Sequence, residues 1–335
     1  MKRRSIAIAL LAISLSGCKQ HLPRDAHEKE IVRIAIHRDP IVFLPLRVSE
    51  THGFYRQEGI EAELSEVSGG SKAMEALLGG SVDVAVGSVS DAILLASQGR
   101  NIRCFYVLYS RPTVALAVAD GLSNKITSIQ GLRGHTVGVS APGSASHQFL
   151  NQLLAEQGLS PDDVSIVPIG MSASSVAALE HRKVDAAVLI ASAITSFEER
   201  HPGTRFLVDT RTAAGAKRAF GSEVFPSLAL IAQDSWIQNH GDAALRLVRA
   251  VRDGVHWMRD SGAEQIRQAI PENERMSMPD SDLKSIHFAQ QAISQDGLLS
   301  DDALRSIVRL LATSDPRVTQ VDISRLYTNE FALSK

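Results

Sequence analysis

The hydrophobic residues of this chain follow a pattern that occurs twice. In each copy a helix-like stretch ends in Ala-Leu, and after four further residues a Val-Asp pair opens a short apolar run. The first copy lies at residues 76–86 and the second at residues 178–188. A continuous apolar run after a helix is typical of a buried strand in an α/β sheet. The repeat therefore predicts two similar α/β units.

Matching elements precede each copy of the repeat. Residues 32–36 and 136–139 are apolar runs that predict opening strands, and residues 61–67 and 164–168 predict second strands. A helix-like stretch follows each opening strand, and we expect the first of these helices at Leu44–Tyr55. Each half thus predicts the order strand, helix, strand, helix, strand. We expect an α/β fold with two similar Rossmann-like lobes around a ligand-binding cleft.

Two further apolar strands are expected where the chain crosses between the lobes. They lie at Thr113–Val118 and Leu228–Ala232. After the second crossing the pattern is helical, with amphipathic helices expected at Asp242–Met258 and Asp301–Leu311. The predicted organisation is residues 31–115 and 228–335 as lobe 1, and residues 116–227 as an inserted lobe 2.

The first residues have the pattern of a lipoprotein signal peptide, expected at residues 1–17. Three basic residues precede the apolar stretch Ile6–Leu15, which is too short to span a bilayer. The sequence Leu-Ser-Gly that leads into Cys18 resembles a bacterial lipobox, which implies lipidation of Cys18 with chains such as palmitate. Residues 18–30 would then be a polar tether to a membrane, on the extracytoplasmic face of a bacterial cell envelope. The alternative is an uncleaved anchor with a chance cysteine.

Composition narrows the possible functions. The chain has 335 residues, with 35 basic and 37 acidic ones, and no basic stripe with interleaved aromatics, so nucleic-acid binding is not expected. Besides Cys18 the only cysteine is Cys104, in an apolar run, where we expect a buried and inert thiol. No zinc-protease motif, nucleophile elbow or dinucleotide fingerprint occurs. We therefore expect a monomeric protein that is not an enzyme and holds no cofactor or metal.

Several short motifs follow one another in a family-specific order. They are Gly53-Phe54-Tyr55, Glu58-Gly59-Ile60, Gly69-Gly70-Ser71, Gly80-Ser81-Val82-Asp83, residues 132–139, Gly143-Ser144, Val184-Asp185-Ala186 and Asp296-Gly297-Leu298-Leu299. Together they resemble the type II periplasmic binding proteins of ABC importers that bind aliphatic sulfonates, nitrate, taurine and thiamine precursors. The resemblance implies a solute receptor that binds one small molecule between its lobes and delivers it to a permease. Fungal pyrimidine synthases share this fold, but they carry a cysteine-rich segment that this chain lacks.

Ligands of such folds bind beyond the carboxyl ends of the strands. Arg38 and Asp39 follow the first strand, where Arg38 would hold an anionic group and Asp39 an ammonium, unless both form a solvated turn. Phe43 would supply one face of the site. Ser88 follows the first Val-Asp strand as a helix cap or a ligand contact. Ala191 takes the corresponding place in lobe 2, where family members often carry an aromatic residue.

The turn after the opening strand of lobe 2 is the most suggestive candidate. Small residues there would leave the amides of a helix N-terminus open to an anion, unless this is an ordinary capped turn. The residues concerned are Ser140, Gly143, Ser144, Ala145 and Ser146. We therefore expect a small organic anion, sulfonate-like or taurine-like, with a thiamine-pyrimidine heterocycle as the alternative. A ligand-binding lipoprotein that acts as a sensor or assembly partner remains a different class of function.

Overall fold

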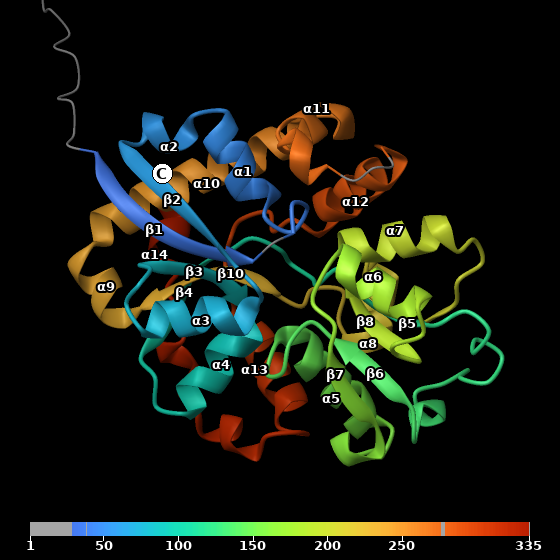
Figure 1. The fold of residues 1–335 in the computed structure, drawn as a ribbon. Helices are drawn as coiled ribbons and strands as arrows, with labels where there is room; N and C mark the ends of the chain where they lie inside the picture. Colours follow the sequence, from blue (N-terminus) through green and yellow to red (C-terminus); the bar gives the residue numbers. More distant parts are fainter. Residues whose placement is uncertain (1–28, 38, 276–278, 335) are drawn as a thin grey trace, which may run out of the picture.

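The computed structural model describes residues 29–37, 39–275 and 279–334. Two five-stranded sheets lie side by side (Figure 1), so the predicted pair of α/β lobes is confirmed. The first sheet has the order β2-β1-β3-β10-β4 and the second β7-β6-β8-β5-β9. The strands are β1 (Glu30–His37), β2 (Ile60–Val67), β3 (Val84–Ser88), β4 (Ile102–Val107), β5 (Val114–Val118), β6 (Thr136–Val139), β7 (Ser165–Pro168), β8 (Ala186–Ile190), β9 (Phe206–Asp209) and β10 (Leu228–Gln233). We call the parts built on the first and second sheets lobe 1 and lobe 2.

Helices cover both faces of each sheet. Figure 1 shows α1, α2 and α10 on one face of the first sheet, with α3 and α4 on the other. The helices are α1 (Leu44–Thr51), α2 (Phe54–Gln57), α3 (Gly70–Leu78), α4 (Val89–Ser97), α5 (Ala145–Glu156), α6 (Ala173–Glu180), α7 (Ser192–Arg200), α8 (Ala213–Phe220), α9 (Asp234–Asn239), α10 (Gly241–Asp260), α11 (Ala263–Gln268), α12 (Pro279–Ala292), α13 (Asp301–Leu311) and α14 (Glu330–Leu333).

The expected first helix is divided into two. It ends as α1 at Thr51, and the chain resumes helical geometry only at α2. Gly53, at the point of division, has a φ of 73°, a left-handed conformation that glycine adopts without steric cost. The prediction of one helix over Leu44–Tyr55 was therefore wrong in its continuity.

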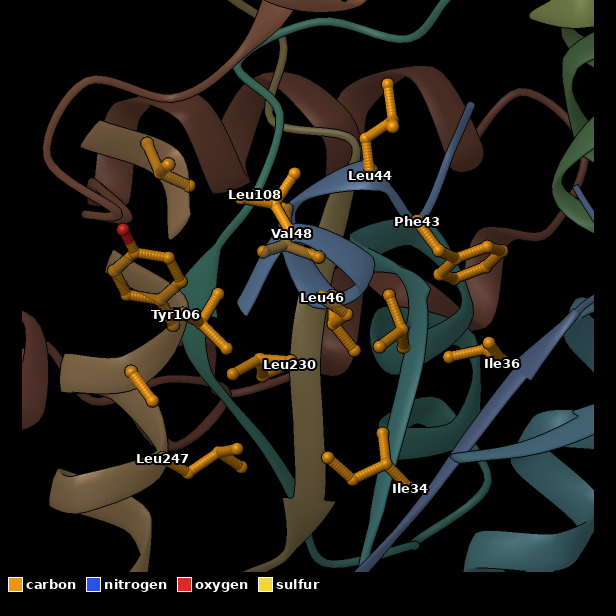
Figure 2. Packing of buried hydrophobic residues seen from close by; sticks show 14 of the residues in the cluster. Ile34, Ile36, Phe43, Leu44, Leu46, Val48, Tyr106, Leu108, Leu230 and Leu247 are labelled. Atoms are coloured by element: carbon orange, nitrogen blue, oxygen red, sulfur yellow. The ribbon is translucent and has the colours of Figure 1, made fainter. Parts of the chain in front are cut away.

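The largest hydrophobic core joins the first sheet to its outer helices. In Figure 2, Ile34 of β1, Tyr106 of β4 and Leu247 of α10 converge with Leu230 of β10. All four side chains are almost fully buried. Helix α10 reaches this position because residue 254 is a glycine: a Cβ there would lie 2.7 Å from the carbonyl oxygen of Pro45 in α1.

One strand in each sheet runs against its neighbours. β10 is antiparallel to β3 and β4, and β5 is antiparallel to β8 and β9. The segments that lead into these strands, residues 108–113 and 221–227, carry the chain between the two sheets. They lie side by side, because the amide of Phe225 donates to the carbonyl of Ser110 over 2.6 Å. The two crossings therefore form one paired connection.

The repeated Val-Asp pair has a structural explanation. The Asp83 carboxylate accepts a hydrogen bond from the amide of Arg33 at 2.9 Å, which ties β3 to β1. Asp185 does the same in lobe 2, where it accepts from the amide of Thr136 at 2.9 Å. Arg33 adds an ion pair to Asp83, and Nδ1 of His135 lies within hydrogen-bond distance of Asp185, at 3.0 Å. The aspartates of the repeat thus stabilise the sheets and lie away from the cleft.

Four sequence predictions fall entirely or nearly entirely on residues that the structure does not describe. The signal peptide, Cys18 and nearly all of the tether lie outside the described residues, as does Arg38. No helix within the described ranges combines the length and the apolar character needed to cross a membrane.

Candidate functional site

A cavity of about 100 Å³ lies between the two lobes. It is built from the carboxyl ends of β1, β3, β6 and β8, the first turns of α4 and α5, and the crossing segments. Its polar lining residues are His37, Ser88, Asp91, Thr113, Ser140, Ser144, Ser146 and Ser227. Its larger apolar lining residues are Val42, Pro112, Val114, Met171, Ile190 and Leu228. The cavity offers a neutral polar and apolar surface with one carboxylate.

That carboxylate belongs to Asp91, in the first turn of α4. Its Oδ2 accepts from the amide of Ser88 at 3.3 Å, while the Ser88 hydroxyl accepts from the amide of Ser90, so the helix start is capped reciprocally. Its Oδ1 accepts from Nε2 of Gln148, on α5 of lobe 2, at 2.9 Å. Asp91 is only 6 % exposed. Burial raises the pKa of Asp91 to about 6.

Three serine hydroxyls form a buried triangle at the start of α5. The Oγ atoms of Ser140, Ser144 and Ser146 lie 2.9 Å from one another. Ser144 is the N-cap of α5, and its hydroxyl accepts from the amide of His147. The hydroxyls bond to each other, and the amides of His147 and Gln148 bond to Ser144. Among the described groups of the first turn of α5, the donors that remain are therefore the amides of Ala145 and Ser146.

A second buried carboxylate joins the lobes beside the cavity. Asp39 accepts from the amides of Ile41 and Val42 through Oδ1, and from the hydroxyls of Ser172 and Ser192 of lobe 2 through Oδ2, at 3.1 and 2.9 Å. Burial raises the pKa of Asp39, and these four hydrogen bonds oppose that rise. Asp39 therefore works as a contact between the lobes, with its acceptor atoms already occupied.

The lobe 2 backbone is strained where it meets Asp39. Ser172 has a φ of 51° and Ala191, which precedes Ser192, has a φ of 37°. Left-handed conformations of this kind are costly for residues with a side chain and tend to persist at functional positions. Both strained residues position a hydroxyl that reaches Asp39, so the strain is located at the junction between the lobes.

His37, at the carboxyl end of β1, also lines the cavity. Burial lowers its pKa to about 4, so the imidazole is neutral near pH 7. Its Nδ1 is buried and makes no hydrogen bond to any described residue. The ring packs edge-on against Phe43, with 4.5 Å between the ring centroids. Phe43 itself is fully buried in the core.

An open groove of about 600 Å³ lies outside the cavity. Residues of lobe 1 around Glu66 and of lobe 2 around Ser172 line it. Met171 lines both the groove and the inner cavity. The groove and the cavity therefore adjoin at this flexible side chain.

The structure gathers half of the sequence-predicted site residues around the cavity. Those that line it are Ser88, Ser140, Ser144, Ala145 and Ser146. Gly143 is exposed in the turn before α5, where its amide donates to Nδ1 of His147. Asp39, Phe43 and Ala191 do not line this cavity, although Ala191 lines a smaller one of about 20 Å³ beside it.

Sequence reasoning missed three residues that the structure makes prominent. These residues are Asp91, Gln148 and Ser172, none of which the sequence pattern marks as a site residue. The pairing of Asp91 with Gln148 joins helices that are distant in sequence, so no local pattern signals it. The reciprocal cap formed by Ser88 and Asp91 was the one available signal, because serine followed three residues later by an acid is a capping pattern.

Comparison with known proteins gives a consistent picture. Residues 41–264 match the family described as NMT1/THI5 like. A solved structure from Bordetella bronchiseptica RB50 is 30% identical, with a TM-score of 0.85, and the match covers 91% of this chain and 96% of that one. YtlA of Bacillus subtilis (strain 168), provisionally named a binding protein, is 22% identical over 96% of this chain and 93% of its own length.

More distant matches carry two different functional names. The periplasmic aliphatic sulphonate binding protein SsuA of Escherichia coli is 19% identical, with a TM-score of 0.68, over 90% of this chain and 99% of its own. The 4-amino-5-hydroxymethyl-2-methylpyrimidine phosphate synthase of Schizosaccharomyces pombe is 22% identical over 67% of this chain and 68% of its own. These matches confirm the expected periplasmic binding protein fold.

Proposed function

Because this chain belongs to the NMT1/THI5-like family and encloses a small cavity between two lobes, we propose that it is the solute-binding component of an ABC importer. It would capture a small organic solute outside the cytoplasm and deliver it to a permease. The observation that carries the proposal is the cavity, whose lining comes from both lobes and from the paired connection between them. A ligand in that position contacts both lobes only when they are closed.

The mechanism that we propose is a shift of population. The open form exchanges solute with solvent, and a solute that touches both lobes favours the closed form in proportion to its preference for that form. The contacts Asp39–Ser192 and Asp91–Gln148 would belong to the closed state. The crossing segments, residues 108–113 and 221–227, would act as the hinge. The permease would recognise the closed arrangement of the lobe surfaces.

Two solute classes have support. A sulfonate-like or taurine-like anion is supported by the open amides at the start of α5 and by the likeness to SsuA. A pyrimidine of the thiamine-precursor type is supported by the relative named as a pyrimidine phosphate synthase. That name also leaves an enzymatic reading to be tested, but the likeness to binding proteins favours binding without catalysis.

Anchoring through Cys18 is the second part of the proposal. The lipobox-like residues before Cys18 support removal of residues 1–17 and acylation of the new N-terminus. Cys18→Ala is expected to accumulate as the unprocessed, unlipidated precursor, seen as a larger species in a gel of whole cells. Normal maturation of this variant would contradict the anchor.

The binding function is tested on the chain that begins at Lys19. Thermal-shift and calorimetric titrations would use alkanesulfonates, taurine, nitrate and 4-amino-5-hydroxymethyl-2-methylpyrimidine, with small-angle scattering to follow closure. A solute at about a hundred times its dissociation constant adds roughly 2.7 kcal/mol of stability. We expect one class to raise the melting temperature and to reduce the radius of gyration. Neither effect with any solute, in protein freed of co-purified ligand, would favour a sensor or assembly role instead.

A further inference from the structure

We infer that the solute of this protein carries a positively charged nitrogen, and that Asp91 is the residue that selects it. This inference rests on the proposed binding function and names the chemistry that the cavity requires. It starts from the charges in the cavity lining. Among the described lining residues Asp91 is the one carboxylate, and no lysine or arginine accompanies it. His37 is neutral near pH 7 because it is buried.

Asp91 differs from the other buried acids of the described chain. Three carboxylates are buried there: Asp39, Asp91 and Asp282. Asp282 forms an ion pair with Arg267 at 2.9 Å, and Asp39 accepts four hydrogen bonds. Asp91 accepts two, one of them long at 3.3 Å, and forms no ion pair with a described residue. A carboxylate withdrawn from water without a counter-charge is destabilising.

The unused acceptor capacity of Asp91 faces the cavity. An ionised carboxylate has about four lone-pair positions, and two of them are occupied here. Gly70 also lines the cavity, and a Cβ at that position would lie 3.6 Å from Asp91 Oδ2. The absence of a side chain at Gly70 therefore leaves the space beside this carboxylate oxygen unfilled by that residue. A cationic N–H group placed there would supply the missing counter-charge and fill the free positions.

The polar groups at the start of α5 bear on an anionic end of the solute. The serine hydroxyls at α5 bond to each other and leave their helix amides as the donors for an anion. A simple anion in a cavity of about 100 Å³ would lie close to the Asp91 charge and be repelled. A solute with an anionic end is therefore accepted when it also carries the cationic nitrogen.

The test compares solutes that differ only in an amine. Isothermal titration calorimetry of the chain that begins at Lys19 would use taurine against isethionate, β-alanine against 3-hydroxypropanoate, and ethanolamine against ethylene glycol. We expect at least one amine to bind, and its hydroxyl counterpart to bind at least tenfold more weakly. Asp91→Asn should weaken the amine at least tenfold. The matched control Asp260→Asn removes the same charge from an exposed site at the end of α10 and should change nothing.

Two results would overturn the inference while the binding function survives. One is an anion without nitrogen, such as isethionate, that binds the unmodified protein as tightly as taurine. The other is an amine whose affinity is the same with Asp91→Asn. The comparison within each solute pair needs no variant, so a folding defect in Asp91→Asn would not remove the test. If solutes of every charge class fail to bind, both the inference and the proposed function fail.

Discussion

Replacement of Asp91 by asparagine is expected to stabilise the ligand-free protein near neutral pH. The side chain keeps its shape and its cap on the amide of Ser88, but it loses the buried charge. Its new amide group would face Gln148, whose unbonded Oε1 becomes the acceptor once the Gln148 amide turns over. This turn gives up the hydrogen bond of 3.2 Å from Gln148 Nε2 to the carbonyl of Gly143, so the variant exchanges a buried charge for the loss of one neutral hydrogen bond.

The magnitude follows from the pKa of Asp91. Burial raises it from 3.8 to about 6. At 1.36 kcal/mol per pKa unit this difference corresponds to about 3 kcal/mol. Because the folded pKa lies above the unfolded one, the folded state binds the proton more tightly. The stability that Asp91 contributes is therefore complete below pH 3.8, declines as the pH rises through 6, and is absent above that range.

Urea denaturation of the wild type and Asp91→Asn from pH 4 to pH 8 would measure this effect. We expect nearly equal unfolding free energies at pH 4 and an advantage for the variant of about 2–3 kcal/mol at pH 8. The other titrating groups contribute equally to both proteins and cancel in the difference. A difference that stays constant with pH, or a variant that is less stable at pH 8, would refute the claim that Asp91 is buried as an uncompensated acid.

Three further variants or reagents probe separate features. Asp39→Ala is expected to lower the unfolding free energy by about 2–4 kcal/mol in urea, because two amides and two hydroxyls lose their acceptor; a loss below 1 kcal/mol would contradict the contact. Ala191→Gly should raise the melting temperature, because it relieves about 1 kcal/mol of backbone strain. A lower melting temperature would contradict the strain inferred from the φ of 37°. Burial raises the pKa of Cys104 to about 12, so a thiol reagent at pH 8 should label it only in denaturant; rapid labelling of native protein would contradict its burial.

The fold could be predicted from the sequence because it depends on local patterns of apolar and polar residues. Continuous apolar runs predicted the buried strands, and the amphipathic spacing of residues 301–311 predicted α13 with its observed bounds. The repeat predicted two similar lobes, since Asp83 and Asp185 fix the same pair of strands in each. The division of the first helix was missed because it depends on the conformation of a single residue, Gly53.

Only part of the candidate site could be predicted from the sequence, because some of its contacts are local and others join the two lobes. The serines at α5 were identifiable because a helix start follows a strand, which is a local feature. The partners of Asp39 and Asp91 lie in the other lobe, more than fifty residues away in sequence. Sequence predicts Asp39 as a free carboxylate for an ammonium, but the four hydrogen bonds that occupy it depend on how the lobes meet. The sequence thus assigned the cationic preference to Asp39, whereas our inference assigns it to Asp91.

The contacts between the lobes explain how a small solute would control closure. Lobe 1 contributes the carboxylates of Asp39 and Asp91. Lobe 2 contributes the uncharged groups that donate to them, which belong to Ser172, Ser192 and Gln148. Hydrogen bonds to a charged group contribute about 1.5–3 kcal/mol each, since water competes for both partners. Burial of the ionised Asp91 opposes this by about 3 kcal/mol. This opposing effect is as large as one or two of the three hydrogen bonds, so it weakens the closed state when no ligand is bound. A cationic group that neutralises Asp91 removes the opposing term, and it does so only when the lobes are closed around it.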